Sequence, residues 1–279
     1  MKVRILTGIL IAFVIAIMFL TADTVFFNII FAVLAALAVF EMSKCVGTEH
    51  KLVLTLPAYI ISVGFPILAH FVKMSSLPIF FAALYVYLLY LLTVSTFSHG
   101  KYELSSVGML YFTEIYILIG VLSLMMLKYL SGGKYLFAMT ILVPVVTDVM
   151  AYFVGVTFGK HKLIPDVSPK KTVEGSVGGT VFGVAIFSVG GLFINRFIPT
   201  VNIELSALVL IGLIISIISQ IGDLVASHIK RHFGIKDYGF ILPGHGGVVD
   251  RLDSVIAVAP LVFFLCYALT FFGTIFAEI

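Results

Sequence analysis

Charged residues are scarce in this 279-residue sequence, and tryptophan is missing altogether. Charged side chains make up 11% of the residues, whereas soluble domains carry about 25%. A soluble globular protein could not cover its surface with so few charges, so that class is excluded. The two cysteines lie at a predicted helix end (Cys45) and deep in an apolar run (Cys266), and neither indicates a disulfide framework or a metal site. The net charge of +3 is too small to indicate nucleic-acid binding.

Long apolar runs take the place of the missing charges, since 61% of the residues are hydrophobic. Unbroken rather than alternating runs predict helices, because only helices or closed barrels satisfy their backbone groups in lipid. At roughly 20 residues per crossing, the sequence predicts an all-α polytopic membrane protein. We expect about nine transmembrane helices, over Val3–Leu20, Val25–Met42, Leu52–Phe71, Leu77–Phe97, Ser105–Leu127, Tyr135–Thr157, Ser176–Ile194, Glu204–His228 and Ser254–Phe276.

The distribution of basic residues predicts the orientation. The first run follows Lys2 and Arg4 and resembles a signal peptide, but it lacks a small-x-small cleavage site, so we expect an uncleaved first helix. Over alternate connections, 13 of the 17 basic residues fall on the side of the N-terminus and 4 on the other side. The positive-inside rule then places the N-terminus and both long loops in the cytoplasm. The alternative is that the long loops are basic for catalytic reasons; without them the counts are 5 and 4.

The two long connections, 158–175 and 229–253, are rich in lysine, aspartate and glycine. Long loops in a compact domain are usually functional. We therefore divide the chain into an N-terminal part, residues 1–130, with about five helices, and a C-terminal catalytic part, residues 131–279, with about four helices and both loops.

The eighth predicted helix continues beyond its apolar part into the second long loop. Asp223, Ser227 and Lys230 recur at i, i+4 and i+7 and therefore share one helix face. An ionised aspartate near the membrane costs about 3 kcal/mol unless it is paired or bound to a metal. The plainer alternative is an ion pair between Asp223 and Lys230 that closes the helix end.

The loop that follows combines glycines, bases and acids. Glycines let backbone N–H groups converge on an anion, basic side chains suit phosphate oxygens, and carboxylates are ligands of Mg²⁺. The combination indicates a metal–phosphate site rather than a plain loop. His245 is either a phosphate donor or acid–base group, or a surface histidine. We expect Asp253, but not Asp250, to cap the ninth helix. The residues concerned are Gly234, Gly239, Gly244, Gly246, Gly247, Lys230, Arg231, Lys236, Arg251, Asp237, Asp250 and Asp253.

The 27 residues from Ser227 to Asp253 resemble the signature of the CDP-diacylglycerol synthases (phosphatidate cytidylyltransferases), through Leu242-Pro243-x-His245-Gly246-Gly247 and Asp250-Arg251-Leu252-Asp253 above all. Motif-level similarity is confined to the second half of the chain. We assign Asp223 and Asp250 to Mg²⁺, and the resemblance allows a second cation such as K⁺. The implied catalytic residues are Asp223, Lys230, Arg231, Lys236, Asp237, His245, Asp250 and Arg251, with Ser227, Gly246 and Gly247 at the substrate.

A second cluster, in the 158–175 loop, resembles a short motif of the same family. Paired lysines beside a threonine suit a triphosphate, although a basic flank of the seventh helix is the simpler alternative. The expected substrate-binding residues are Ser168, Lys170, Lys171, Thr172 and Glu174, together with Asp148, which lies in the D-x-x-A-Y-x-x-G pattern of the sixth helix. Glu114 has no motif around it, and we interpret it as a polar contact between helices.

The resemblance implies an integral membrane nucleotidyltransferase of the bacterial inner membrane, with its active site facing the cytoplasm. It would join CTP to phosphatidate from the bilayer, giving CDP-diacylglycerol and pyrophosphate by in-line attack of the lipid phosphate on the α-phosphate of CTP. The implied partners are these two substrates and no nucleic acid, and a homodimer is left open. Two alternatives remain, a membrane lipid kinase using CTP or ATP and a transporter of an anionic solute.

Overall fold

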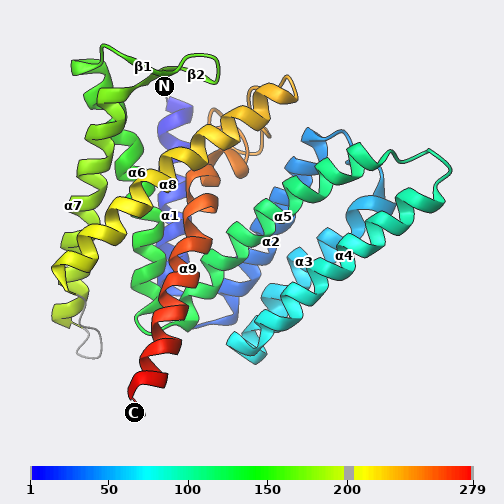
Figure 1. Cartoon of the computed structure of the whole chain (residues 1–279), viewed down its shortest axis with the longest axis horizontal. Coiled ribbons are helices and arrows are strands. Elements are labelled where there is room, and N and C mark those ends of the chain that lie inside the picture. Colours follow the sequence, from blue (N-terminus) through cyan, green and yellow to red (C-terminus); the bar gives the residue numbers. More distant parts are fainter. Residues whose placement is uncertain (1, 198–203, 278–279) are drawn as a thin grey trace. The chain divides into compact units, whose positions relative to one another are not determined.

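The chain is almost entirely helical in the computed structural model, which describes the backbone of residues 2–197 and 204–277 and the side chains of residues 7–196 and 204–268 (Figure 1). Its α-helices over these ranges are α1 (Lys2–Leu20), α2 (Val25–Cys45), α3 (Leu52–Val72), α4 (Leu77–Phe97), α5 (Leu104–Met126), α6 (Gly133–Phe158), α7 (Val173–Phe197), α8 (Leu205–His232) and α9 (Val249–Ala277). Two 3-10 turns, η1 (Lys73–Ser76) and η2 (Leu127–Tyr129), and two strands, β1 (Lys162–Ile164) and β2 (Ser168–Thr172), complete the described elements.

Six stretches of the described residues are long and apolar enough to cross a membrane. One of them, Leu52–Phe97, contains both α3 and α4. An integral, all-α membrane protein is therefore confirmed, while nine crossings stay a prediction. The eighth helix has 28 residues and is thus about 42 Å long, so it is longer than a hydrocarbon core of about 30 Å.

Two predicted boundaries were wrong. The 158–175 connection is not an irregular loop, because β1 and β2 pair as an antiparallel hairpin in which Lys162 opposes Thr172, and α7 begins directly after it at Val173. Helix α9 begins at Val249 rather than Ser254. The charged residues that made this segment look like loop form the first turns of the helix, where an acid is favourable.

The residues form two compact units that are each discontinuous in sequence. The first contains residues 1–126 and 232–252, and the second contains residues 127–231 and 253–279. The segment 232–252 therefore clusters with the N-terminal helices, although it carries the signature that the sequence analysis placed in the C-terminal part. Each unit is described by itself below.

In the first unit, α2 packs against α3 and α5, and α4 packs against both α3 and α5 (Figure 1). Glu114 of α5 is fully buried at the centre of these helices. Its carboxylate accepts hydrogen bonds from the hydroxyl of Ser43 in α2, at 3.0 Å, and from the hydroxyl of Tyr87 in α4. The interpretation of Glu114 as a polar contact between helices is therefore confirmed.

In the second unit, α6 and α7 run side by side in close contact (Figure 1). The close approach is possible because α7 has glycines at a spacing of four residues, Gly175, Gly179 and Gly183, which fall on one helix face. A Cβ atom on Gly179 would lie 2.6 Å from the carbonyl oxygen of Thr147 and 2.9 Å from the Cβ of Ala151, both in α6.

Replacement of Gly179 by leucine should therefore force α6 and α7 apart. We expect Gly179→Leu to destabilise the protein by about 1–3 kcal/mol, the usual range for overpacking. Val177→Leu is the matched control, because Val177 lies two residues away on α7 with its side chain 59% exposed. The measurement is the Tm of both variants in detergent. Equal Tm values for Gly179→Leu and the unmodified protein would contradict this packing.

Candidate active site

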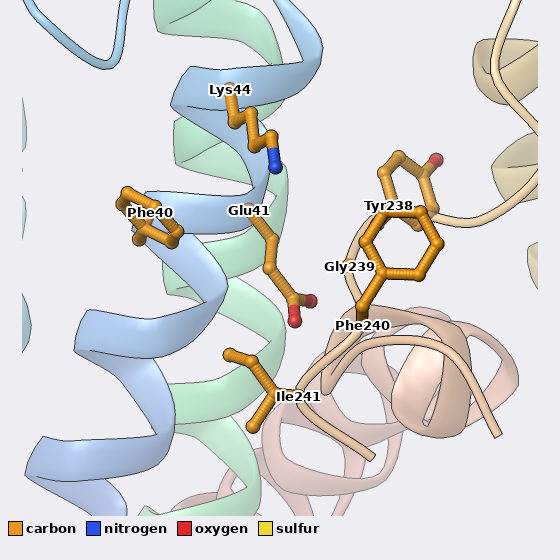
Figure 2. Close-up of a pocket in the computed structure, with 7 residues that line it drawn as sticks. All are labelled: Phe40, Glu41, Lys44, Tyr238, Gly239, Phe240 and Ile241. Carbon is orange, nitrogen blue, oxygen red and sulfur yellow. The ribbon is translucent and has the colours of Figure 1, made fainter. Parts of the chain in front are cut away.

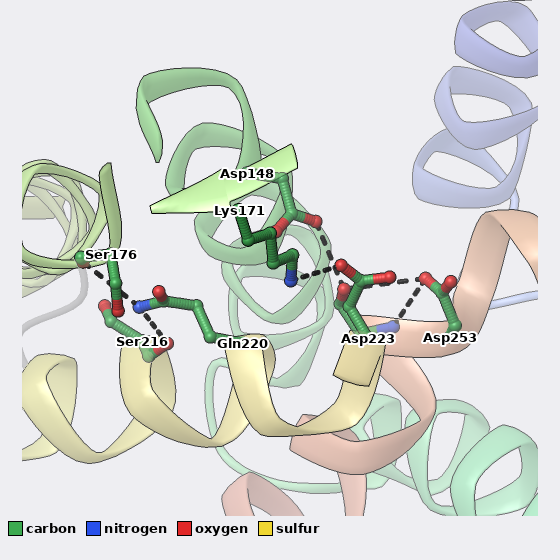
Figure 3. Close-up of polar contacts among 8 residues, drawn as sticks. Asp148, Lys171, Ser176, Ser216, Gln220, Asp223 and Asp253 are labelled. Atoms are coloured by element: carbon green, nitrogen blue, oxygen red, sulfur yellow. Dashed lines mark hydrogen bonds and ion pairs between the residues drawn. The ribbon is translucent and has the colours of Figure 1, made fainter. Parts of the chain in front are cut away.

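Three aspartates of the second unit come together from three different helices (Figure 3). They are Asp148 of α6, Asp223 of α8 and Asp253 of α9, and we call them the carboxylate cluster. Lys171 of β2 forms an ion pair with Asp223. The hydroxyl of Ser254 donates to Asp148 at 3.1 Å, and the backbone N–H of Ser254 donates to Asp253 at 2.8 Å.

The charges of the carboxylate cluster act on one another. Asp223 and Asp148 lie close enough to Asp253 to repel its negative charge, while Lys230 attracts it. Lys230 is itself buried. Three acids beside two lysines leave an excess of negative charge in a half-buried position, and this arrangement favours the binding of a cation.

The oxygen donors of the cluster are of the type that Mg²⁺ prefers. Among the described residues, no three His, Cys, Asp or Glu side chains form a ready-made metal-binding group. Mg²⁺ does not require such a group, because it usually takes one or two carboxylates and completes its shell with waters and substrate phosphates. The donor set therefore fits Mg²⁺ held together with a phosphorylated substrate.

The β1–β2 hairpin explains how Lys171 is positioned. Thr172, the last residue of β2, caps α7, because its hydroxyl accepts the N–H of Gly175 at 3.1 Å. Glu174, in the first turn of α7, accepts the backbone N–H of His161 at 3.2 Å and contacts its Nδ1 at 2.6 Å. These two contacts attach both ends of the hairpin to α7 and so fix the position of Lys171. Ser168 is half-buried and Lys170 is exposed.

Helix α8, which carries Asp223, is attached to α7 by a buried glutamine. The side-chain amide of Gln220 donates to the hydroxyl of Thr180 at 2.9 Å. It also reaches the carbonyl oxygen of Ser176 at 3.4 Å (Figure 3). Because Gln220 lies one turn before Asp223, these bonds fix the rotation of α8 that turns Asp223 towards Lys171. Ser227, one turn further on, is half-buried.

The signature segment of the first unit forms a compact loop, residues 236–248, which we call the glycine loop. At its tip, the N–H of His245 donates to the carbonyl oxygen of Leu242 at 2.8 Å across Pro243 and Gly244. Proline at the second position and glycine with a φ of 76° at the third are typical of a type II turn. The hydroxyl of Thr7 in α1 donates to the carbonyl oxygen of Pro243 at 2.9 Å and attaches this tip to the unit.

Asp250 organises the base of the glycine loop. Its Oδ2 accepts the N–H of Tyr238 at 2.8 Å and that of Gly247 at 2.9 Å. Asp250 therefore reaches back from the first turn of α9 and holds two backbone N–H groups of the glycine loop, not of the helix. The expectation that Asp253 is the cap was wrong, because the helix begins four residues before Asp253, whose side chain joins the carboxylate cluster instead.

The other predicted residues of the signature differ in how exposed their side chains are. Arg231, Lys236 and Arg251 are exposed, and Asp237 is half-buried. His245 is half-buried, and its Nδ1 has no hydrogen-bond partner in the part of the chain that the structure describes. Gly246 has a φ of 82°, and Gly247 is buried.

Sequence reasoning missed one acid of the first unit altogether. Glu41 of α2 points at the glycine loop beside a pocket of about 260 Å³, which is lined by Phe40, Glu41, Lys44 and residues 238–241 (Figure 2). The signal that could have found it is an acid inside an apolar helix, which is a functional candidate by default. No sequence spacing connects it to the signature, which lies about 200 residues later.

Comparison with known proteins agrees with these observations. The chain matches the cytidylyltransferase family over residues 2–269. It is 37% identical over 275 residues to the phosphatidate cytidylyltransferase of Bacillus subtilis (strain 168), an overlap of 95% of this chain and 97% of that protein. The phosphatidate cytidylyltransferase of Staphylococcus saprophyticus is 40% identical over 171 residues, 61% of this chain and 63% of that protein. That of Staphylococcus haemolyticus is 45% identical over 131 residues, 47% of this chain and 48% of that protein. The resemblance seen in the signature is confirmed, and the chain belongs to the cytidylyltransferase family.

Proposed function

We propose that this protein transfers the cytidylyl group of CTP to phosphatidate and releases pyrophosphate, giving CDP-diacylglycerol. The observation that carries the proposal is the similarity to the Bacillus subtilis phosphatidate cytidylyltransferase along 95% of the chain. The site supports it, because the residues that the signature supplies are acids, bases and closely packed glycines, as phosphoryl chemistry requires.

The reaction needs positioning and charge neutralisation more than a strong base. An oxygen of the lipid phosphate forms a bond to the α-phosphorus of CTP, while the bond from that phosphorus to the bridging oxygen of the β-phosphate breaks and pyrophosphate leaves in line. Both reactants are anions, so their mutual repulsion is a large part of the barrier. In this proposal Lys171, Lys230 and Arg231 offset that charge in the second unit. Lys236 of the glycine loop and Arg251 of α9 do so in the first unit.

The proposed metal is Mg²⁺, held by Asp223 and Asp250. When bound, it would neutralise phosphate charge and orient the oxygens of the triphosphate. The carboxylate cluster adds Asp253 and Asp148 as further donors beside Asp223. Asp250 already accepts two backbone N–H groups through Oδ2, so it also has a structural role. A second cation such as K⁺ stays a prediction.

The proposed location is the bacterial inner membrane with the active site at the cytoplasmic face. CTP is a cytoplasmic nucleotide and phosphatidate diffuses in the bilayer, so the site has to open to both. The positive-inside count supports this orientation. The proposed partners are these two substrates, without nucleic acid; a homodimer stays a prediction.

The reaction itself gives the first test. Purified protein in mixed micelles should convert radiolabelled CTP and phosphatidate to CDP-diacylglycerol, with one pyrophosphate released per lipid and a requirement for Mg²⁺. Diacylglycerol should not replace phosphatidate, since it lacks the attacking phosphate. Release of CDP or ADP, with a lipid alcohol as acceptor and no pyrophosphate, would instead identify a lipid kinase.

The carboxylate cluster gives the second test. Asp223→Asn should lower kcat at least about a hundredfold, because the charge that it removes is worth several kcal/mol in the transition state. The matched control is Asp166→Asn, which removes an exposed aspartate at the turn of the hairpin and should keep normal turnover. Tm values in detergent verify that both variants fold. Normal turnover of Asp223→Asn at saturating Mg²⁺ would refute the assignment.

The orientation gives the third test. In a chain without its natural cysteines, Asp166→Cys and Phe240→Cys should react with a membrane-impermeant maleimide only in inside-out vesicles. Lys134→Cys, at the opposite end of α6 from the hairpin, should react only in right-side-out vesicles. All three positions are exposed, so access depends on the side of the membrane. The reverse labelling pattern would overturn the topology.

A further inference from the structure

Glu41 is a buried acid in a helix that is otherwise almost without charge. It is 1% exposed, and the only other charged residue of α2 is Lys44. Its two carboxylate oxygens accept the backbone N–H groups of Val248 and Val249, each at 2.9 Å. Figure 2 shows the side chain directed from α2 towards the backbone of the glycine loop.

The two donors are the N–H groups at the beginning of α9. The first N–H groups of a helix have no partner inside the helix and carry its positive dipole end, so they need an acceptor from elsewhere. Both donors are buried, with Val248 5% and Val249 1% exposed, which leaves little access for water. Glu41 supplies the acceptor from α2 and thereby fixes the place where α9 begins.

Two glycines of the signature lie directly against the same carboxylate. A Cβ atom added to Gly239 or to Gly247 would overlap the carboxylate oxygens of Glu41. Neither glycine has a positive φ, so their small size rather than their conformational freedom is what the structure requires. The carboxylate is therefore enclosed by the loop backbone at Gly239 and Gly247 and by the start of α9.

We propose that Glu41 is a positioning residue for catalysis, a fixed internal anion that holds the glycine loop and the start of α9 in their active arrangement. The proposal rests on the proposed function, because the glycine loop carries His245 and the start of α9 carries Asp250 and Arg251. Both oxygens of Glu41 are taken by N–H groups, so Glu41 acts through the loop and not on the substrate. Of the charged groups around it, Lys44 attracts the carboxylate and Asp250 repels it.

The test uses Glu41→Gln, which keeps the shape and removes the charge. An amide can accept only through its oxygen, so its NH₂ group must face one of the two backbone donors. We expect kcat to fall at least about tenfold, as for the loss of a charge-assisted hydrogen bond, with a smaller change in the KM for CTP. Glu41→Asp keeps the charge but is too short to reach both donors. Its kcat should therefore lie between those of the unmodified protein and Glu41→Gln.

Glu114→Gln is the matched control. It neutralises a buried acid of the same unit that accepts hydrogen bonds from the hydroxyl groups of Ser43 and Tyr87. A hydroxyl can rotate to accept from an amide. Glu114→Gln should therefore lower the Tm without disturbing the glycine loop, and kcat should stay near that of the unmodified protein.

A second readout reports on the loop directly and needs no activity. Val248→Cys places a thiol at a buried position beside Glu41, in a chain whose Cys45 and Cys266 are replaced by alanine. Its rate of reaction with a maleimide should rise about fivefold or more when Glu41→Gln is added, since local opening sets the access of buried groups. Addition of Glu114→Gln should leave the rate unchanged.

The outcomes separate this inference from the proposed function. Lower kcat together with faster labelling in Glu41→Gln alone supports positioning by Glu41. Normal kcat in Glu41→Gln would overturn it. Equal losses of kcat and of Tm in Glu41→Gln and Glu114→Gln would also overturn it, because general destabilisation would then explain both variants. If Glu41→Gln does not fold, an unchanged kcat in Glu41→Asp overturns it. Failure of the unmodified protein to use CTP and phosphatidate would refute the proposed function, while the labelling difference would still test the contact.

Discussion

A carboxylate inside an apolar helical bundle needs hydrogen-bond donors from the bundle itself, since water is excluded there. This constraint governs where the acids of the chain lie and which elements they join. Glu114 joins three helices through two hydroxyl groups. Glu41 joins α2 to the beginning of α9 through two backbone N–H groups. In each case one acid connects elements that hydrophobic packing alone would hold less specifically.

The signature owes its composition to structure as well as to chemistry. Gly247 is needed for close packing against Glu41, and Asp250 holds the N–H groups of Tyr238 and Gly247. A residue can therefore belong to the motif of an enzyme without touching its substrate. The carboxylate cluster of the second unit differs, because its three acids lie beside two lysines, Lys171 and Lys230, and its charges remain poorly balanced. Unbalanced charge of that kind is what a polyanionic substrate with its cation can use.

The helices could be predicted from the sequence because apolar runs of the necessary length have no other stable structure in lipid. The hairpin was missed because β1 and β2 have three and five residues, too few for an alternating pattern to stand out. The start of α9 was missed because Asp250 and Arg251 resemble loop residues until their partners are known. Within the site, the sequence pointed to Asp223 and its neighbours, whereas the contact between Lys171 and Asp223 depends on the attachment of both the hairpin and α8 to α7. The role of Glu41 could not be predicted, because a contact between residues 207 positions apart leaves no periodic pattern in the sequence.

The discontinuous composition of the first unit has a consequence for biosynthesis. Helix α2 emerges from the ribosome long before the N–H groups that Glu41 requires, because these lie 207 and 208 residues further along. At about 5–20 residues per second, the delay is roughly 10–40 s. During this interval α6, α7 and α8 of the second unit are synthesised, while the acid of α2 is still without its final partners. The first unit is thus begun before the second but is completed only after most of the second has been synthesised, and until then the nascent α2 has to stay in the membrane without the partners of Glu41.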